Sequence, residues 1–161
     1  MNSKDFYTFR RYMNSMDSRL TASMEDYMEM IYRLSQDNGF TRIHDLSESL
    51  NVQPSSATKM VQKLSEMGLL IYEKYGSISL KDSGKEVGVA LLARHKVVED
   101  FMRLIGVDEE NVLEETEKVE HTLSQATLSC IGELVAFWRE NDDVKTRFDE
   151  HRKGHCSDSN G

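Results

Sequence analysis

The chain has 161 residues, a formal net charge of −8 and 39% hydrophobic residues, which is an ordinary globular composition for one domain or two small ones. No apolar run reaches the length of a membrane span and the N-terminus lacks a continuous apolar signal core, so we expect a cytoplasmic protein with no membrane partner. The cysteines, Cys130 and Cys156, form neither a metal motif nor a disulfide framework, and Cys130 is expected to pack within an apolar helix.

The charge is distributed unevenly along the chain. Residues 1–82 contain 10 Lys and Arg against 11 Asp and Glu, whereas residues 83–161 contain 10 against 17. A nearly neutral front half and an acidic rear half indicate a binding module followed by a part with a different task. A generally acidic protein with no such division is the alternative.

The first part of the chain has the element order of a winged helix-turn-helix. Residues 1–20 read as a flexible N-terminal extension. Residues 23–39 predict a helix capped by Ser23, residues 41–52 a short helix, and residues 54–70 a helix with Pro54 in its first turn. Residues 70–82 predict a two-stranded hairpin turning at Tyr75-Gly76. We therefore expect a mainly α protein whose residues 21–82 form a winged helix-turn-helix.

The rear part reads as helices only. Long apolar-striped segments cover residues 84–106, 108–124 and 125–140, and the stripe fades from about residue 141. We expect a helical domain over residues 83–149 and a disordered tail over residues 150–161.

The second helix of a helix-turn-helix reads DNA with side chains near its N-terminus. Hydroxyl, ammonium and amide groups at that position and at the hairpin tip suit contacts with phosphates and base edges. The candidate DNA-binding residues are Ser55, Ser56, Thr58, Lys59, Gln62, Lys74 and Tyr75. A helix pair with a merely solvated polar face is the alternative.

Carboxylates and imidazoles lie beside the apolar stripes of three predicted helices. They are Asp26, Glu29, His95, Glu117, Glu120 and His121. Taken singly, each reads as a core histidine or a solvated acid. If the three faces converge, two unit charges about 4 Å apart repel by roughly 4 kcal/mol at an effective dielectric of about 20, so protons or cations must compensate. An oxygen-rich set with imidazole and no thiolate favours manganese, and six ligands suffice for two ions.

These motifs resemble the diphtheria-toxin-repressor family, and in particular its manganese-responsive branch. The resemblance rests on SMEDYMEMIY, PSSATKMVQKL, LIYEKYG, RLIGVDEE and EKVEHTLS, and extends from about Thr21 to about Asp149. It implies that the same six residues bind Mn²⁺, whereas iron-responsive relatives have sulfur-bearing residues at the positions of Asp26 and Glu120. It also implies a homodimer formed by the C-terminal helices, with Leu128, Ile131, Leu134, Val135 and Trp138 in the interface or core.

The resulting hypothesis is a manganese-activated repressor that binds a palindromic DNA operator and represses manganese uptake genes. The alternatives are a winged-helix regulator that responds to iron, zinc or a small organic ligand, and a dinuclear metal hydrolase. Two further options are metal binding by His151, His155 and Cys156 in the tail, and a minor-groove arm carrying Arg10 and Arg11.

Overall fold

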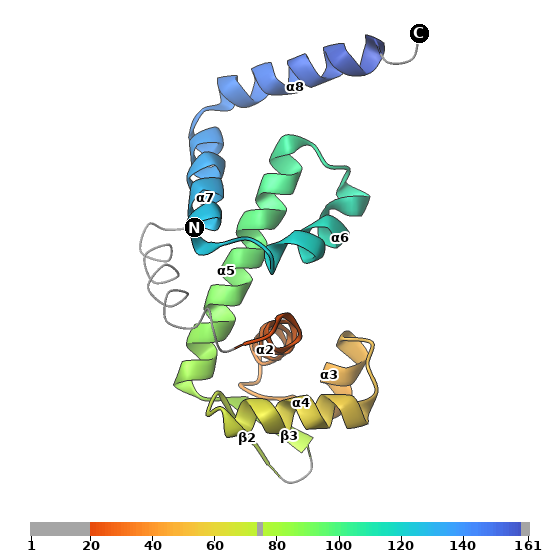
Figure 1. Cartoon of the computed structure of the whole chain (residues 1–161), viewed down its shortest axis with the longest axis vertical. Helices are drawn as coiled ribbons and strands as arrows, with labels where there is room; N and C mark the ends of the chain where they lie inside the picture. Colours follow the sequence, from red (N-terminus) through yellow and green to blue (C-terminus); the bar gives the residue numbers. More distant parts are fainter. Residues whose placement is uncertain (1–19, 74–75, 159–161) are drawn as a thin grey trace. The chain divides into compact units, whose positions relative to one another are not determined.

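The computed structural model describes residues 20–73 and 76–158 (Figure 1). Of residues 153 and 155–158 it describes the helical backbone only. The chain divides into two units between Ala93 and Arg94, and each is described by itself below. The expected N-terminal extension, including Arg10 and Arg11, and the hairpin-tip residues Lys74 and Tyr75 lie outside the described residues.

The first unit begins with helix α2 (Ala22–Leu34). Its N-cap is Thr21, whose hydroxyl oxygen accepts a hydrogen bond from the backbone N–H of Met24 at 3.4 Å, so the prediction of Ser23 as the cap is wrong. Ser23 instead lies in the first turn. Tyr27, Met28 and Ile31 form the buried face of α2, which orients the polar side of the helix.

Helices α3 (Ile43–Ser49) and α4 (Pro54–Glu66) form the predicted helix pair and pack on each other and on α2 (Figure 1). Leu46, Ala57, Val61 and Leu64 are fully buried between the helices. Burial of this face fixes the opposite face of α4 toward solvent.

The predicted hairpin is present as β2 (Leu70–Tyr72) and β3 (Ser77–Leu80), with Leu70 opposite Leu80. A third strand, β1 (Thr41–Arg42), pairs antiparallel with β3 to give the order β1-β3-β2. The sequence pattern predicts these two residues at the start of the short helix, and this prediction is wrong. Strand β1 has only two residues, and its structure depends on pairing with β3, which lies 35 or more positions later in the chain.

Helix α5 (Asp82–Ile105) runs from the first unit into the second. Its N-terminal part packs closely on α2, because a Cβ atom added at Gly88 would lie 2.5 Å from the side chain of Tyr32. Position 88 therefore requires glycine, because the crossing of α5 and α2 leaves no space for a side chain.

The second unit comprises the rest of α5 with α6 (Glu109–Glu120), α7 (Gln125–Glu140) and α8 (Asp142–Asp158). Its buried apolar residues are Val97, Val98, Val112, Leu128 and Val135. None of the helices in the described residues is long and apolar enough to cross a membrane.

Two expectations for this unit differ from the structure. Residues 150–158 continue helix α8, where we expected a disordered tail; ion pairing of Lys145 with Asp149 one turn apart supports this polar helix. Cys130 is exposed, because the buried face of α7 is formed by Leu128, Ser129 and Val135.

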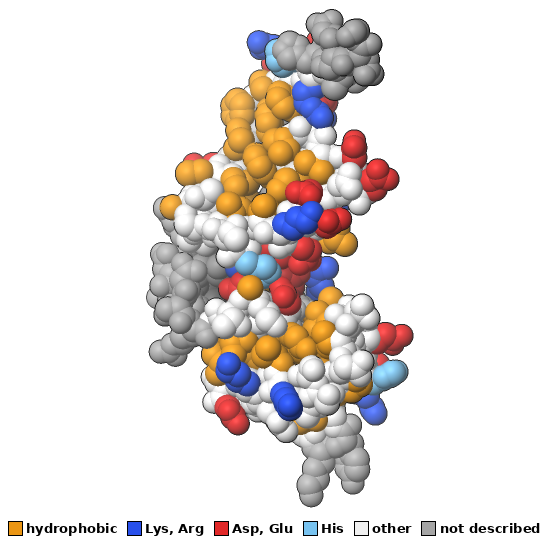
Figure 2. Space-filling view, turned by 45° about the vertical axis from the view of Figure 1, so that its right-hand side comes forward, with side chains coloured by type: hydrophobic (Ala, Val, Ile, Leu, Met, Phe, Trp, Pro, Cys, Tyr) orange, Lys and Arg blue, Asp and Glu red, His pale blue; other side chains and the backbone are white. Residues whose placement is uncertain are grey.

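Part of the apolar surface of this unit is exposed. Figure 2 shows hydrophobic side chains gathered over it, and its exposed large hydrophobic residues are Leu113, Leu134 and Phe137. Among the residues expected at an interface or in the core, Leu128 and Val135 are buried, Ile131 and Trp138 are half-buried, and Leu134 is exposed. Helix α7 thus has one apolar face in the core of the unit and further apolar side chains at the surface.

Candidate metal centre and DNA-reading surface

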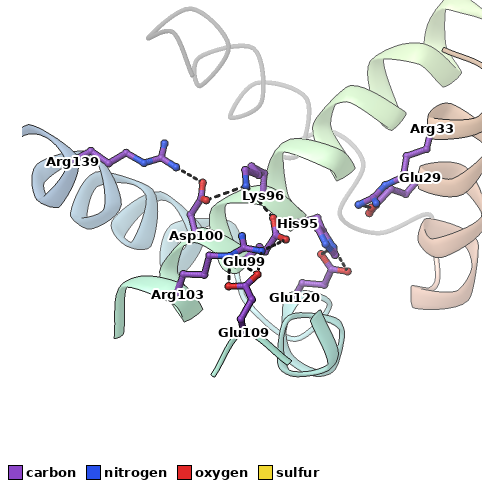
Figure 3. A network of polar contacts seen from close by, with 10 residues as sticks. All are labelled: Glu29, Arg33, His95, Lys96, Glu99, Asp100, Arg103, Glu109, Glu120 and Arg139. Carbon is purple, nitrogen blue, oxygen red and sulfur yellow. Dashed lines mark hydrogen bonds and ion pairs between the residues drawn. The ribbon is translucent and has the colours of Figure 1, made fainter. Parts of the chain in front are cut away.

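A buried imidazole and a buried carboxylate face each other in the second unit. The Nδ1 atom of His95 on α5 lies 3.3 Å from Oε2 of Glu120 on α6 (Figure 3). The same nitrogen lies 3.8 Å from Oε1 of Glu117. His95 is 4% exposed and Glu120 is 1% exposed. His95 lies on the same face of α5 as buried Val98, one turn further along, as its spacing predicts.

One oxygen of this cluster lacks a hydrogen bond. Oε2 of Glu120 is buried and accepts no hydrogen bond from any residue that the structure describes. Leaving a buried carboxylate oxygen unsatisfied is costly, and such groups are normally hydrogen-bonded or bound to a cation. Together with an all-oxygen and imidazole donor set, this oxygen makes the cluster a chemically suitable site for a divalent ion.

His121, at the end of α6, contacts a residue that we did not predict from the sequence. The Nη2 atom of Arg94 lies 2.9 Å from Nδ1 of His121, and Arg94 is only 3% exposed. Because guanidinium only donates, Nδ1 of His121 must be the acceptor. Glu117 and His121 also each offer a ligand atom within 4.8 Å of the other.

The remaining two candidate ligands belong to α2 in the first unit. Glu29 is 9% exposed and Asp26 is half-buried, and both lie on the same side of the helix one turn apart. Glu29 accepts a hydrogen bond from Nη2 of Arg33 at 2.5 Å (Figure 3). The structure therefore brings together the four candidates of the second unit, and their convergence with Asp26 and Glu29 stays a prediction.

A network of ion pairs between α5, α6 and α7 lies beside the His95–Glu120 pair (Figure 3). Arg103 binds Glu99 at 2.8 Å and Glu109 at 2.7 Å, which ties α5 to the start of α6. Asp100 pairs with Lys96 at 3.1 Å and with Arg139 of α7 at 2.5 Å. The hydrogen bond from Arg103 lowers the pKa of Glu99 to about 2, so this carboxyl stays charged at neutral pH. The network holds the helices that carry the cluster.

The predicted DNA-reading surface is polar and exposed on α4. Ser55, Ser56, Lys59 and Gln62 are all exposed. Thr58 is half-buried, and its hydroxyl donates to the carbonyl of Pro54 at 2.9 Å. Its oxygen can therefore only accept, for example from a base amino group. Arg42 and His44, at the start of α3, are exposed as well. The side chains needed for contact with DNA are therefore available on one helix.

Sequence reasoning missed both arginines of the candidate centre. Arg33 lies four residues after Glu29, and this spacing is a usable signal for a helical ion pair. Arg94 directly precedes His95, but its partner is 27 residues away, and nothing in the sequence indicates that contact.

Comparison with known proteins assigns a family to both parts of the chain. Residues 19–78 match the family of the iron dependent repressor, N-terminal DNA binding domain. Residues 81–149 match the iron dependent repressor, metal binding and dimerisation domain. The two matches follow each other directly and together extend over most of the chain.

Several similar relatives are transcriptional regulators. The HTH-type transcriptional regulator MntR of Bacillus pumilus is 49% identical over 123 residues, which are 76% of this chain and 85% of that protein. MntR of Bacillus subtilis is 48% identical over 125 residues, which are 78% of this chain and 88% of that protein.

Solved structures show the same fold. A manganese-dependent transcriptional repressor in complex with manganese superposes with a TM-score of 0.64 at 28% identity. The match covers 71% of this chain but only 53% of that longer protein.

Proposed function

The chain belongs to the MntR group of the iron-dependent repressor family, and from this premise we propose that it is a manganese-activated repressor whose six acidic and imidazole side chains bind Mn²⁺. It is a DNA-binding transcriptional regulator and not an enzyme. In this proposal it represses genes for manganese uptake when the ion is abundant, and it acts in the cytoplasm, where its DNA is.

The observation that carries the proposal is the buried pair His95 and Glu120. A buried carboxylate oxygen without a hydrogen bond in the described part of the chain, next to an imidazole nitrogen at 3.3 Å, is a suitable place for a cation. The donors are oxygen and nitrogen only, which favours manganese over the softer ions that select thiolates.

The proposed ligands are Asp26, Glu29, His95, Glu117, Glu120 and His121, which suffice for two ions. A bound divalent ion supplies the positive charge that four carboxylates need in order to approach one another. Asp26 and Glu29 belong to the DNA-binding unit and the other four residues to the second unit, so ligation by all six couples the two units. If Mn²⁺ binds the form in which the two units are coupled more favourably than the uncoupled form by about 1–3 kcal/mol, the affinity for DNA rises about 5- to 150-fold.

DNA binding is assigned to α4 and to the hairpin of β2 and β3, which is the wing of the winged helix-turn-helix. Ser55, Ser56 and Lys59 are proposed to position α4 on phosphates, Thr58 to accept from a base amino group, and Gln62 to read an adenine edge. Lys74 and Tyr75 of the wing are proposed to contact the sugar-phosphate backbone or the minor groove of the DNA.

We further assign homodimer formation to α7. Its exposed Leu134 and Phe137, in a domain family that mediates dimerisation, support a two-fold interface. A two-fold dimer presents two copies of α4 to a palindromic operator with half-sites spaced by whole helical turns.

The test starts with selection of binding sequences from a random duplex DNA library in the presence of Mn²⁺. Affinity for the selected duplex is then measured with Mn²⁺, Fe²⁺, Zn²⁺ or chelator. The proposal requires tight binding with Mn²⁺ and weak binding with chelator. Glu120→Ala is expected to abolish the stimulation, whereas Glu114→Ala, at an exposed position of the same helix, retains it. Equal affinity with Mn²⁺ and chelator would contradict the proposal.

A further inference from the structure

Two arginines contact proposed metal ligands, each within its own unit. Arg33 donates from Nη2 to Oε1 of Glu29 at 2.5 Å, and Arg94 places Nη2 2.9 Å from Nδ1 of His121. The proposed function uses neither arginine. Each guanidinium is permanently charged and contacts a residue that is proposed to bind a cation.

The contact of Arg94 is incompatible with metal ligation by His121. A neutral imidazole has a single acceptor lone pair, and here that lone pair, on Nδ1, accepts from Arg94. Ligation through Nδ1 takes this lone pair directly. Ligation through Nε2 moves the ring proton to Nδ1, where it would face the guanidinium donors. By either route Arg94 has to withdraw before His121 binds an ion.

The contact of Arg33 opposes metal binding by charge. The Glu29 side chain is 11% exposed and the Arg33 side chain is 39% exposed, so the carboxylate is held inside while the guanidinium reaches it from the surface. A carboxylate can accept from both an arginine and an ion, but a cation at 2.5 Å repels a second cation at the same group. Because Arg33 is near water, it can leave Glu29 at small cost.

We propose that Arg33 and Arg94 are internal competitor cations that occupy the Glu29 carboxylate and the acceptor nitrogen of His121 in the metal-free protein and must be displaced when Mn²⁺ binds. This inference rests on the proposed function, since it assumes that both residues are ligands. It adds a regulatory property: the two arginines raise the Mn²⁺ concentration at which the protein responds. It also explains how the buried acid of α2 is tolerated without metal.

The test measures Mn²⁺ affinity of the full chain from the electron paramagnetic resonance signal of free Mn²⁺. Arg33→Gln is expected to bind Mn²⁺ about two- to five-fold more tightly than wild type, the range for a partly exposed ion pair. Lys85→Gln is the matched control, because it removes one positive charge from an exposed pair with Asp82 in the same unit. Its affinity is expected to stay at the wild-type value.

Arg94→Gln is compared in the same way with Lys145→Gln, which removes a cation paired with Asp149 on α8 in the same unit. The Arg94 substitution is expected to tighten binding at least as much as Arg33→Gln. Since Arg94 is buried, its variant is checked for folding by circular dichroism. A long-range ¹H–¹⁵N spectrum of the metal-free wild type gives a reading that needs no variant, because the contact requires His121 to be protonated on Nε2.

The outcomes separate the two proposals. Failure of wild type to bind Mn²⁺ overturns the proposed function. Mn²⁺ binding by wild type with unchanged or weaker affinity in Arg33→Gln overturns the competitor role alone. A His121 ring protonated on Nδ1 in the metal-free protein overturns the part assigned to Arg94.

Discussion

The Nδ1 atom of His95 lies 3.3 Å from Oε2 of Glu120, and both side chains are almost completely buried. The pair joins α5 to α6 inside the second unit. Oε2 of Glu120 has no hydrogen bond within the described residues, which is costly for a buried carboxylate without a bound cation. Stability and metal binding should therefore respond in opposite directions when Glu120 is changed.

Glu120→Gln keeps the shape of the side chain and removes its charge. We expect the metal-free variant to unfold at the same temperature as wild type or above it, because a buried charge is lost. Mn²⁺ at 100 times its dissociation constant should stabilise wild type by about 2.7 kcal/mol and the variant far less. Thermal melts with Mn²⁺ and with chelator measure both effects. Glu114→Gln, exposed on the same helix, serves as the control, and a metal response in Glu120→Gln equal to that of Glu114→Gln would exclude Glu120 as a ligand.

Glu99 makes stability depend on acidic pH. Its hydrogen bond with Arg103 lowers its pKa from 4.5 to about 2. A carboxyl with a lowered pKa stabilises the fold fully above the unfolded value of 4.5, and this contribution is lost as the pH falls toward 2. Glu99→Gln should lower the free energy of unfolding at pH 7 by about 0.5–1 kcal/mol, after allowance for solvent screening.

Urea unfolding of the metal-free protein between pH 7 and pH 2 measures this dependence. The difference between wild type and Glu99→Gln should shrink below pH 4.5. Glu110→Gln, exposed on α6, is the control. A difference that stays constant over the whole range would show that the side chain acts by packing and not by charge.

Gly88 marks the crossing of α5 over α2. A Cβ atom there would lie 2.5 Å from Tyr32, so Gly88→Ala should destabilise the first unit by about 1–3 kcal/mol through overpacking. Gly154→Ala is the matched control, because nothing lies within 4 Å of its added Cβ, and it should stabilise α8 slightly. Chemical unfolding followed by circular dichroism compares the two, and equal stability of both variants would refute the close packing.

Helix α7 is expected to form the dimer interface through its exposed apolar residues. Leu134→Glu should shift the protein from dimer to monomer, since a charge in an apolar interface is strongly unfavourable. Sedimentation velocity measures the shift, with exposed Glu133→Ala as the control. An unchanged dimer in Leu134→Glu would place the interface on another surface.

Gln62 and Lys59 should affect DNA binding in different ways. Lys59→Ala should weaken binding to all DNA sequences nearly equally and reduce the salt dependence of the affinity by about one counterion. Gln62→Ala should lower the discrimination between the selected operator and a site changed at one adenine, by about 1–3 kcal/mol. Competition binding separates the two effects. Undiminished discrimination in Gln62→Ala would move base reading to another residue of α4.

The long elements could be predicted because their sequence patterns are local. The stripes of α2, α4 and α5, the proline at the start of α4 and the hairpin each depend on neighbouring residues. The burial of His95 followed from its place in the stripe of α5. Strand β1 was missed because its two residues are extended only through pairing with a distant strand.

Other features depend on which side of a helix faces the core and on contacts between helices, and the sequence does not indicate either. Cys130 lies in a helix that is apolar on more than one side, so periodicity alone did not reveal which side faces the core. The contact of Arg94 with His121 joins two helices, and no spacing along one helix predicts it. The candidate ligands could be predicted from their residue types, whereas the arginine side chains that contact them were found only in the structure.

The central claim is that Mn²⁺ binds Asp26, Glu29, His95, Glu117, Glu120 and His121. Anomalous diffraction at the manganese edge, from crystals grown with Mn²⁺, tests it most directly. We predict anomalous peaks enclosed by these six side chains, with Arg33 and Arg94 turned away from Glu29 and His121. Bound manganese at other side chains only, with His95 still facing Glu120 and no peak beside them, would contradict the account.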